Sequence, residues 1–397
     1  MRALRPTPVE DRYDVVVVGA RAAGAATAML LAESGLRVLV VDRSRYGVDT
    51  LSTHALMRGG VMQLHRWGLL EHVIDKGTPA VRKVTFHYAG EELPIKIKPM
   101  HGVDALYAPR RTVLDPILVD AAQRAGAEVR YGVTISGVKR NYKGRVTGVV
   151  GRDEKGQGVS FDAGLVIGAD GMRSTIAQRV GAPVVRTGSS TTAVVYGYWR
   201  DLEPEGGDAG YEWFFRPSAG AGVIPTNGGE SCVFVGGSPS RVGTGGERVM
   251  SELLRDASPS LAARVAAAEA PTGVRTFMGR PGLIRRPWGP GWALVGDAGY
   301  WKDPISAHGL TDALRDAELL ARAVISAGGG CVELDAALRG YQEARDRLSF
   351  RLFDVSDALA SFTWSDEEIA PLLFEMSASM NDEVDEIAAL DGVAVGC

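Results

Sequence analysis

The fold is decided by the stretch Val15-Val-Val-Val-Gly19-Ala-Arg-Ala-Ala-Gly24, near the start of the chain. Its apolar run stops at Gly19, as a buried strand does before a tight turn, and an alanine-rich helical segment opens at Gly24. The N–H groups at the start of such a helix are free to face a pyrophosphate. The next apolar run, Arg37-Val-Leu-Val-Val-Asp42, ends in a carboxylate suited to an adenosine ribose hydroxyl. This order of strand, glycine turn, helix, strand and acid predicts the front edge of a dinucleotide site.

Arg21 stands where the usual fingerprint has its second glycine, which lets the backbone approach the pyrophosphate closely. An arginine that points outward can instead donate a charged hydrogen bond to phosphate, so the substitution is compatible with binding. The alternative is a βαβ unit whose glycine turn binds nothing, because short glycine patterns also arise by chance.

Two blocks far downstream favour the binding interpretation. The first, Leu165-Val-Ile-Gly-Ala-Asp170-Gly171, has the pattern of a strand that ends in an acid and a turn. The second begins with Trp292-Ala-Leu-Val-Gly296-Asp297 and passes through Pro304 into a helical pattern after His308. A carboxylate at such a strand end accepts a bond from a sugar or ribityl hydroxyl. The following helix would offer its positive end to a ring that becomes anionic on reduction.

In the order of these three blocks, the chain resembles the FAD-dependent aromatic hydroxylases, which are group A flavoprotein monooxygenases, and their relatives among the geranylgeranyl reductases and flavin halogenases. The resemblance covers roughly residues 12 to 330. It implies bound FAD and NAD(P)H as a transient reductant. In such enzymes the reduced flavin reacts with O2 to give a peroxide at ring carbon C4a, while the protein excludes water and holds the substrate nearby.

The resemblance also implies which residues contact the adenosine half of FAD. Asp42 would hold the ribose, Arg43 would lie beside the adenine, and Val133 would give the adenine a backbone contact. The Asp170-Gly171 block would touch both the pyrophosphate region and the path of the reductant. The residues expected along the pyrophosphate are Gly19, Arg21, Ala22, Ala23 and Gly24.

The flavin half is assigned in the same way. Asp297, with Gly296 before it, would hold the ribityl chain, and Arg111 matches a family arginine that contacts the flavin. The residues expected to approach the isoalloxazine are Pro304 and the amides of Gly309 and Leu310.

Composition fits an ordinary enzyme. A chain of 397 residues with 45% hydrophobic and 23% charged residues can bury a large core, and we expect two domains. A formal net charge of −4 gives no reason to expect nucleic acid or an anionic membrane as a partner. Cys232, Cys331 and Cys397 are scattered and odd in number, which argues against a disulfide framework or a paired-cysteine zinc site. No apolar run is long enough to cross a bilayer, and we expect a cytoplasmic location.

The middle of the chain is rich in strand patterns from about residue 189 to residue 238, and a hairpin pattern covers residues 81–98. The predicted fold class is α/β, with a Rossmann-like FAD-binding domain, an inserted antiparallel β-sheet substrate domain, and C-terminal helices. The expected boundaries are 12–77, 104–183 and 275–330 for the FAD-binding domain, 78–103 and 184–274 for the substrate domain, and 331–397 for the helical region.

A substrate pocket is expected where this sheet meets the flavin. Trp213 and Phe215 should share one face of their strand, because neighbouring side chains alternate. Ile224 and Pro225 are the other pocket candidates. Apolar residues of the C-terminal helices, such as Met376, are expected to pack in a core, with lining of the pocket as the second interpretation.

No residue is assigned to catalysis with a definite role. The sequence has no Gly-x-Ser-x-Gly elbow after a strand, and its six histidines show no metal-binding pair at helical spacing, so no metal site is predicted. The cofactor must then carry the reaction. His54, after the second strand, and His308, beside the flavin-facing loop, are candidates for handling a proton.

The predicted function is an FAD-dependent monooxygenase that uses NAD(P)H and O2 to hydroxylate or epoxidise a small aromatic or apolar substrate. Halogenation is disfavoured because the segment Gly220–Pro225 lacks the two tryptophans of the halogenase motif. The segment Tyr211–Pro217 matches the Tyr-x-Trp-x-Phe-Pro motif of geranylgeranyl reductases with one inserted residue, so an FAD-dependent reductase of a prenyl-type double bond is the alternative. A flavin-binding module without turnover is a third class. The oligomeric state is left open.

Overall fold

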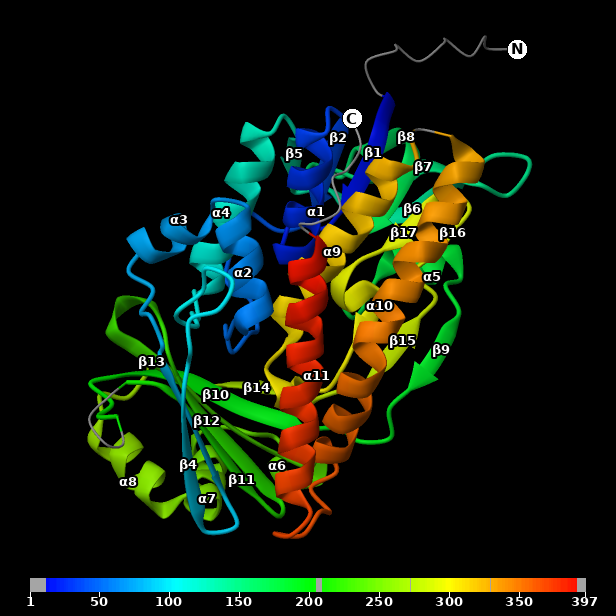
Figure 1. The fold of residues 1–397 in the computed structure, drawn as a ribbon. Coiled ribbons are helices and arrows are strands. Elements are labelled where there is room, and N and C mark those ends of the chain that lie inside the picture. Colours follow the sequence, from blue (N-terminus) through cyan, green and yellow to red (C-terminus); the bar gives the residue numbers. More distant parts are fainter. Residues whose placement is uncertain (1–11, 205–208, 272, 329, 391–397) are drawn as a thin grey trace.

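The glycine-turn stretch lies in the middle of a large sheet in the upper half of the computed structural model, which describes residues 12–204, 209–271, 273–328 and 330–390 (Figure 1). The strands of this sheet are β1 (Arg12–Val18), β2 (Val38–Asp42), β5 (Glu128–Tyr131), β6 (Thr134–Arg140), β7 (Val146–Arg152), β8 (Gly158–Gly168), β16 (Trp288–Gly289) and β17 (Trp292–Leu294). β1 pairs in parallel with β2 on one side and β8 on the other. Val15 to Val18 are all buried, as a strand covered on both faces requires.

Most of the helices cover one face of this sheet, and the antiparallel β6–β7 segment lies toward the other together with the short helix at residues 175–180 (Figure 1). The helices associated with the sheet are α1 (Ala22–Glu33), α2 (Arg58–Arg66), α3 (Leu70–Asp75), α4 (Arg111–Arg124), α5 (Thr175–Val180) and α9 (Gly309–Ser326). α1 packs against both α4 and α9. Met29, Leu114 and Leu314 meet in the apolar core that these helices share.

A second sheet forms the lower half of the molecule (Figure 1). Its strands are β3 (Lys83–Tyr88), β4 (Glu91–Lys96), β10 (Ala193–Arg200), β11 (Tyr211–Arg216), β12 (Ala219–Pro225), β13 (Glu230–Gly237) and β14 (Arg275–Phe277). Neighbouring strands are antiparallel except for β3 and β11, which run parallel. The expected hairpin therefore joins this sheet, and the sheet contains one parallel pair.

Alternation along β11 sends its aromatic side chains to opposite faces, as predicted. Trp213 and Phe215 lie in an apolar cluster that also holds Ile224 of β12. Phe214 lies in the cluster on the other face, where α7 (Glu247–Ala257) and α8 (Pro259–Ala267) supply Met250 and other apolar residues. Pro259 opens α8 and marks the break between the two helices.

Two long C-terminal helices connect the two halves. α10 (Cys331–Ala360) and α11 (Ile369–Ala389) run side by side from the first sheet down to the second (Figure 1). Leu359, Trp364 and Met376 from this part of the chain pack in the same cluster as Trp213, so the expected core role of these residues is confirmed.

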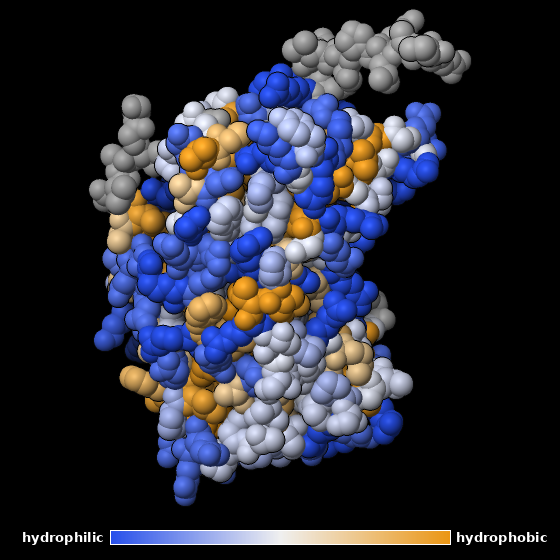
Figure 2. Space-filling model, turned by 90° about the vertical axis from the view of Figure 1, so that its right-hand side faces the viewer, coloured by the Kyte–Doolittle hydropathy of each residue, from blue (hydrophilic) through white to orange (hydrophobic). Residues whose placement is uncertain are grey.

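A small third sheet lies beside α10 and contains β9 (Val184–Thr187), β15 (Leu283–Arg285) and β18 (Tyr300–Trp301). Figure 2 views the molecule from the side on which these elements lie in Figure 1. Its surface is largely hydrophilic, with an apolar patch near the middle and a hollow at one edge. No helix among the described residues is long and apolar enough to cross a membrane. The predicted fold class is confirmed.

Candidate active site

The glycine turn brings three backbone segments into close contact. Gly19 has a φ of +113°, and a Cβ on it would lie 2.3 Å from the carbonyl oxygen of Ala169. A Cβ on Gly24 would lie 1.9 Å from the carbonyl oxygen of Gly19. Only glycine fits either position without displacing the backbone. The two glycines thus hold the start of α1, the end of β1 and the end of β8 together, while Ala22 and Ala23 form the first turn of α1.

Asp42, at the end of β2, ties the turn in place. One carboxylate oxygen accepts a 2.7 Å hydrogen bond from the Ala20 amide, and the other accepts bonds from the amide and hydroxyl of Ser44. The amide of Val133 donates to the Asp42 carbonyl at 2.9 Å, so both expected adenosine contacts lie together. Arg43 is exposed. The carboxylate keeps further lone pairs for a ribose hydroxyl, which remains a prediction.

Asp115 is a site residue that the sequence prediction missed. Arg111, at the start of α4, donates two hydrogen bonds of 2.9 Å to its carboxylate, and Arg21 lies 3.7 Å away. Burial raises the pKa of Asp115, and the charge of Arg111 opposes that rise. Arg21 and Arg111 are therefore gathered beside the glycine turn, where two guanidinium groups share one carboxylate. The i, i+4 spacing of Arg111 and Asp115 on a helical pattern was the available signal.

The Gly296-Asp297 block lies directly on the first turn of α1. Gly296 has a φ of +57°, and a Cβ on it would lie 2.9 Å from the Cβ of Ala23. Burial raises the pKa of Asp297 to about 6, although Lys302 and Arg111 act in the opposite direction. Within the described part of the chain, no hydrogen bond or ion pair holds this carboxylate. A carboxylate without a partner can accept hydrogen bonds from the hydroxyl groups of a polyol chain.

Asp170 has a structural task in addition to its predicted one. Its carboxylate accepts bonds from the Ser174 hydroxyl and from the amides of Thr175 and Ile176, at 2.5, 2.6 and 3.2 Å. It thereby satisfies the free amides at the start of α5. Burial raises its pKa, although these bonds oppose the rise. These hydrogen bonds at the start of α5 account for an acid at position 170. A contact between Asp170 and the cofactor or the reductant remains a prediction.

The segment expected to face the flavin is connected to the second sheet. Asp303 accepts a 2.7 Å bond from the amide of Thr192, just before β10, and a 3.0 Å bond from the amide of Ile305. Pro304 begins a short 3-10 turn, η4 (Pro304–Ser306), and Gly309 and Leu310 open α9. Gly309 is exposed, and a Cβ on it would meet no atom within 4 Å. The first amides of α9 have no acceptor within the helix, and Gly309 among these residues is exposed.

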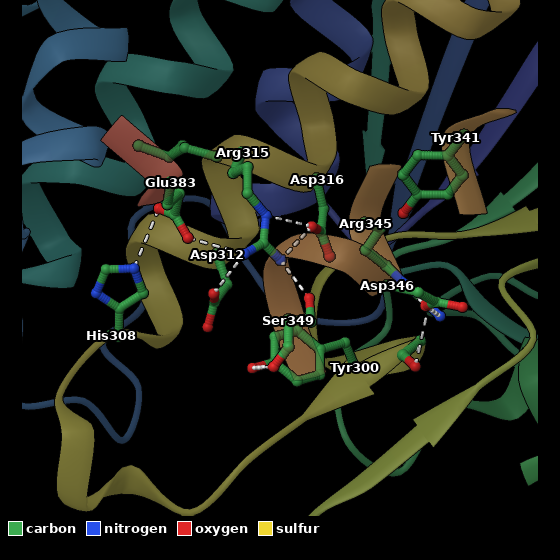
Figure 3. A network of polar contacts seen from close by, with 12 residues as sticks. Tyr300, His308, Asp312, Arg315, Asp316, Tyr341, Arg345, Asp346, Ser349 and Glu383 are labelled. Carbon is green, nitrogen blue, oxygen red and sulfur yellow. Dashed lines mark hydrogen bonds and ion pairs between the residues drawn. The ribbon is translucent and has the colours of Figure 1, made fainter. Parts of the chain in front are cut away.

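His308 does not lie free beside this loop. Its ring is buried, and Nε2 lies 3.1 Å from a carboxylate oxygen of Glu383 on α11 (Figure 3). Glu383 also accepts a 2.8 Å bond from Arg315 of α9. Burial acts to raise the pKa of Glu383, but His308 and Arg315 outweigh it and lower that pKa to about 2. The ring of His308 thus contacts Glu383 of α11. The two residues are 75 positions apart, so the local sequence contains no sign of this contact.

Arg315 is the centre of this buried network, which we call the Arg315 network. Its guanidinium also bonds Asp312, Asp316 and the hydroxyl of Ser349 on α10 (Figure 3). The ligand atoms of His308, Asp312 and Glu383 lie within 4.8 Å of one another, a spacing that suits a metal ion. Two cations already lie against these carboxylates, because Arg315 bonds both and Lys302 pairs with Asp312. We therefore interpret the cluster as an ion network.

His54 lies between the two halves of the molecule. Its side chain is 1% exposed, its φ is +67°, and Nε2 lies 2.5 Å from the hydroxyl of Tyr198 on β10. The guanidinium of Arg110 lies 3.6 Å above the Tyr198 ring. Burial and the charges of Arg110 and Arg111 lower the pKa of His54 to about 3, so the ring is neutral. Tyr198 and Arg110 were not predicted, since nothing in the local sequence links them to His54.

The predicted pocket residues separate into two places. Trp213, Phe215 and Ile224 share the apolar cluster beneath the C-terminal helices, together with Ala307 of the flavin-facing loop. Pro225 instead lines a depression of about 380 Å³ on the second sheet, which also contains Glu212 and Arg264. In that depression Arg264 forms an ion pair of 2.7 Å with Glu212.

A larger depression, of about 600 Å³, lies beside the small third sheet. We call it the arginine depression, since Arg173, Arg280 and Arg285 line it together with Trp301 and no carboxylate. The elements that form it lie on the side shown in Figure 2. Arg285 is half-buried, and burial lowers its pKa. Cationic lining without a counter-charge suits an anionic ligand.

Comparison with known proteins agrees with this geometry. Residues 12–356 match the family described as FAD binding domain. The chain is 30% identical to digeranylgeranylglycerophospholipid reductase 2 of Methanopyrus kandleri over 76% of this chain and 74% of that protein. It is 28% identical to the aklavinone 12-hydroxylase RdmE of Streptomyces purpurascens over 55% of this chain, but this match spans only 44% of the hydroxylase.

A solved structure shows the same fold. The crystal structure of PqsL, a probable FAD-dependent monooxygenase from Pseudomonas aeruginosa, has a TM-score of 0.75 and 21% identity. The alignment covers 91% of this chain and 99% of that one. The expected resemblance and the FAD cofactor are confirmed, and NAD(P)H is the typical reductant. The chain therefore belongs to the FAD-binding family of oxidoreductases that includes the group A flavoprotein monooxygenases.

Proposed function

We propose that this protein is an FAD-dependent monooxygenase that consumes NAD(P)H and O2 and inserts oxygen into a small aromatic or apolar substrate. The observation that carries the proposal is the position of Asp297. It follows Gly296, which packs against Ala23 in the first turn of α1, and its carboxylate has no partner among the described residues. A family flavin would satisfy it through ribityl hydroxyls.

The rest of the site fits the same cofactor. The close backbone contacts at Gly19 and Gly24 leave the first amides of α1 as donors to phosphate, and Arg21 and Arg111 add positive charge beside them. The opening turn of α9 at Gly309 would offer amides to the flavin ring. When bound, FAD would supply two-electron redox chemistry and the activation of O2.

The protein's own residues would bind the substrate and exclude water. Trp213, Phe215 and Ile224 belong to the buried apolar cluster on one face of the second sheet, and Ala307 of the flavin-facing loop belongs to the same cluster. The bond between Asp303 and Thr192 fixes this loop to the sheet. An apolar surface held against the loop suits a small, largely apolar ring.

The arginine depression supports an anionic reductant. Arg173 follows the Asp170-Gly171 turn, and Arg285 donates a 3.4 Å bond to the carbonyl of Ala298, next to Asp297. The depression is therefore connected to both downstream blocks of the cofactor site. Its volume and its three guanidinium groups suit a dinucleotide phosphate.

The alternative is an FAD-dependent reductase of a prenyl-type double bond. It is favoured by the similarity to digeranylgeranylglycerophospholipid reductase 2 and by the aromatic segment of β11. The similarity to aklavinone 12-hydroxylase favours oxygen insertion. The two reactions differ in whether the reduced enzyme uses O2 to modify the substrate.

Rapid mixing separates these functions. FAD-loaded protein is reduced anaerobically and mixed with oxygenated buffer, and the flavin absorbance is followed with and without phenolic or prenyl compounds. We expect a transient spectrum distinct from oxidised and reduced flavin, with a lifetime that a phenolic ligand changes, and incorporation of ¹⁸O from ¹⁸O2 into the product. Direct return to oxidised flavin under every condition, with anaerobic reduction of a prenyl compound, would establish the reductase instead.

A further inference from the structure

His54 combines a strained backbone with a partly unsatisfied ring. A φ of +67° is uncommon for a residue other than glycine, and such strain is retained where the surrounding structure holds it in place. The side chain is 1% exposed, and Nδ1 has no hydrogen-bond partner among the described residues. A buried polar atom of this kind is rare, because losing a bond to water costs about 1–3 kcal/mol. The unpartnered nitrogen therefore points to a ligand.

The partner of the other nitrogen fixes which one carries the proton. The hydroxyl of Tyr198 lies 2.5 Å from Nε2, and within the described ranges it has no second hydrogen-bond partner. We assign Tyr198 as the donor and Nε2 as the acceptor, because the hydroxyl proton requires an acceptor. A neutral imidazole with Nε2 as acceptor carries its proton on Nδ1. Nδ1 is then a hydrogen-bond donor.

The charges around His54 favour an electron-rich ligand atom. The guanidinium groups of Arg110, Arg111 and Arg275 act on the ring, and the carboxylate of Asp49 acts against them. Arg110 is held by Glu230 at 2.7 Å and by Asp49 at 3.3 Å, with its plane over Tyr198. The positive surroundings keep the ring neutral and favour an oxygen that carries partial or full negative charge.

The position of His54 connects it to the proposed reaction site. Tyr198 belongs to the second sheet, whereas Arg111 belongs to the cofactor site through Asp115. Ala55, the next residue, packs in the cluster of Trp213 and Ala307. The ring thus lies where the apolar substrate surface meets the flavin-facing segments.

We propose that Nδ1 of His54 donates a hydrogen bond to a conjugated carbonyl, quinone or phenolate oxygen of the ligand, and that Tyr198 sets the tautomer. The inference rests on the proposed function, since it places this oxygen in the substrate site. The substrate is then an apolar ring system that bears such an oxygen. A prenyl chain without oxygen would leave Nδ1 unsatisfied.

Equilibrium dialysis of the oxidised, FAD-loaded protein tests this inference without turnover. The probes are 1-tetralone, a conjugated aromatic ketone, and tetralin, which has the same rings without the oxygen. We expect the wild type to bind tetralone about five- to tenfold more tightly, because one hydrogen bond contributes about 1 kcal/mol. Equal affinity for the two probes, or no binding of tetralone, would overturn the inference.

Two substitutions of His54 locate the donor atom. The amide nitrogen of asparagine lies where Nδ1 lies, and asparagine also tolerates a positive φ. Glutamine reaches the position of Nε2 instead. We expect His54→Asn to keep most of the preference for tetralone and His54→Gln to lose it, with tetralin affinity unchanged in both. Retention in His54→Gln, or equal loss in both variants, would contradict the assignment of Nδ1.

Tyr198→Phe keeps the test decisive if His54→Gln binds no FAD. It removes only the hydroxyl, so Nδ1 keeps its proton for part of the time, and we expect a two- to threefold smaller preference. An unchanged preference would overturn the role of Tyr198. The matched controls are His72→Gln on the exposed surface of α3 and Tyr142→Phe, whose ring is 92% exposed. Both should leave the preference unchanged.

The outcome is separable from that of the oxygen experiment. A transient oxygen-dependent spectrum with no tetralone preference would leave the proposed monooxygenase function intact and remove the role of His54. A tetralone preference that His54→Gln abolishes, in an enzyme that never uses O2, would retain the binding site and remove the monooxygenase.

Discussion

Arginine side chains gather in two regions of this molecule, with opposite surroundings. In the Arg315 network, the guanidinium of Arg315 is 0% exposed and bonds three carboxylates and a hydroxyl from three helices (Figure 3). In the arginine depression, three guanidinium groups line about 600 Å³ of open space, and no carboxylate lines it with them. The charge of Arg315 is neutralised by carboxylates of the protein. The charges of the arginine depression are not neutralised by its lining, and they are available to an anionic ligand.

The difference shows how to separate charges that hold the fold from charges that bind a ligand. Burying a guanidinium is costly, and Arg315 is tolerated because its partners are buried with it. Arg285 is half-buried, yet its guanidinium donates to the backbone carbonyl of Ala298 and to no carboxylate among the described residues. Removing a partner should therefore harm stability in the first region, and removing an arginine should harm ligand affinity in the second.

The largest effect is expected from Glu383→Ala in the Arg315 network. The substitution leaves Arg315 and His308 buried without the carboxylate they share. Breaking a buried pair in this way lowers the free energy of unfolding by about 3–5 kcal/mol. Urea unfolding followed by tryptophan fluorescence measures it, with Glu367→Ala on an exposed turn as the control. A loss as small as that of the control would mean that the network contributes little.

The next effect concerns Asp297, whose carboxylate, like the guanidinium groups of the arginine depression, faces no opposite charge at bonding distance among the described residues. We expect Asp297→Asn to weaken FAD binding about ten- to a hundredfold, because a charged hydrogen bond contributes about 1.5–3 kcal/mol. Titration of the apoprotein with FAD, followed by flavin fluorescence, measures the Kd. Asp366→Asn, at an exposed position, should bind FAD normally. Unchanged affinity in the Asp297 variant would remove the main support for the proposed cofactor geometry.

A smaller effect is expected in the arginine depression itself. The double substitution Arg280→Ala and Arg285→Ala removes two of its three charges, and we expect the KM for NADPH to rise about tenfold with kcat nearly unchanged. Stability should hardly change, in contrast to Glu383→Ala. Arg255→Ala, on the exposed surface of α7, is the control. If kcat fell and KM stayed constant, the depression would not be a site of reductant binding.

The smallest effect is expected from His54, which is buried like Arg315 but is neutral, and it concerns the pH dependence of stability. The pKa of His54 is lowered from 6.5 to about 3 in the folded protein, so below pH 6.5 the unfolded chain binds more protons than the folded one. The contribution of His54 to stability is therefore complete well above pH 6.5 and is lost as the pH falls through 6.5 toward 3. Between pH 7 and pH 6 the loss is about 0.7 kcal/mol. Urea midpoints at the two pH values should move closer together in His54→Asn, and an unchanged difference would show that His54 does not contribute.

The fold and the cofactor blocks were predictable because their signals are local. A continuous valine run marks β1, glycines mark close backbone approaches, and alternation assigns Trp213 and Phe215 to one face. Each of these patterns spans only a few residues, and each reflects a steric or solvation requirement that the local sequence must meet. The order of the blocks then identified the family.

The partners of the site residues were not predictable, because they are far away in sequence. Tyr198 lies 144 residues from His54, and Glu383 lies 68 residues from Arg315. Asp42 and Asp170 were predicted as ligand-binding acids. In the structure each carboxylate also accepts hydrogen bonds from backbone amides, Asp42 at the glycine turn and Asp170 at the start of α5. The sequence has no pattern that distinguishes an acid that only binds a ligand from one that also binds backbone amides.

The position of Glu383 in the chain has a consequence for synthesis on the ribosome. The Arg315 network gains this carboxylate only when α11 is made, after α9 and α10 have been completed. Until then Arg315 has no bond to Glu383, and the apolar cluster around Trp213 lacks the residues that α11 contributes to it, such as Met376. The last long helix thus finishes the core as well as the network, and a nascent chain stalled before it would be a natural substrate for chaperones.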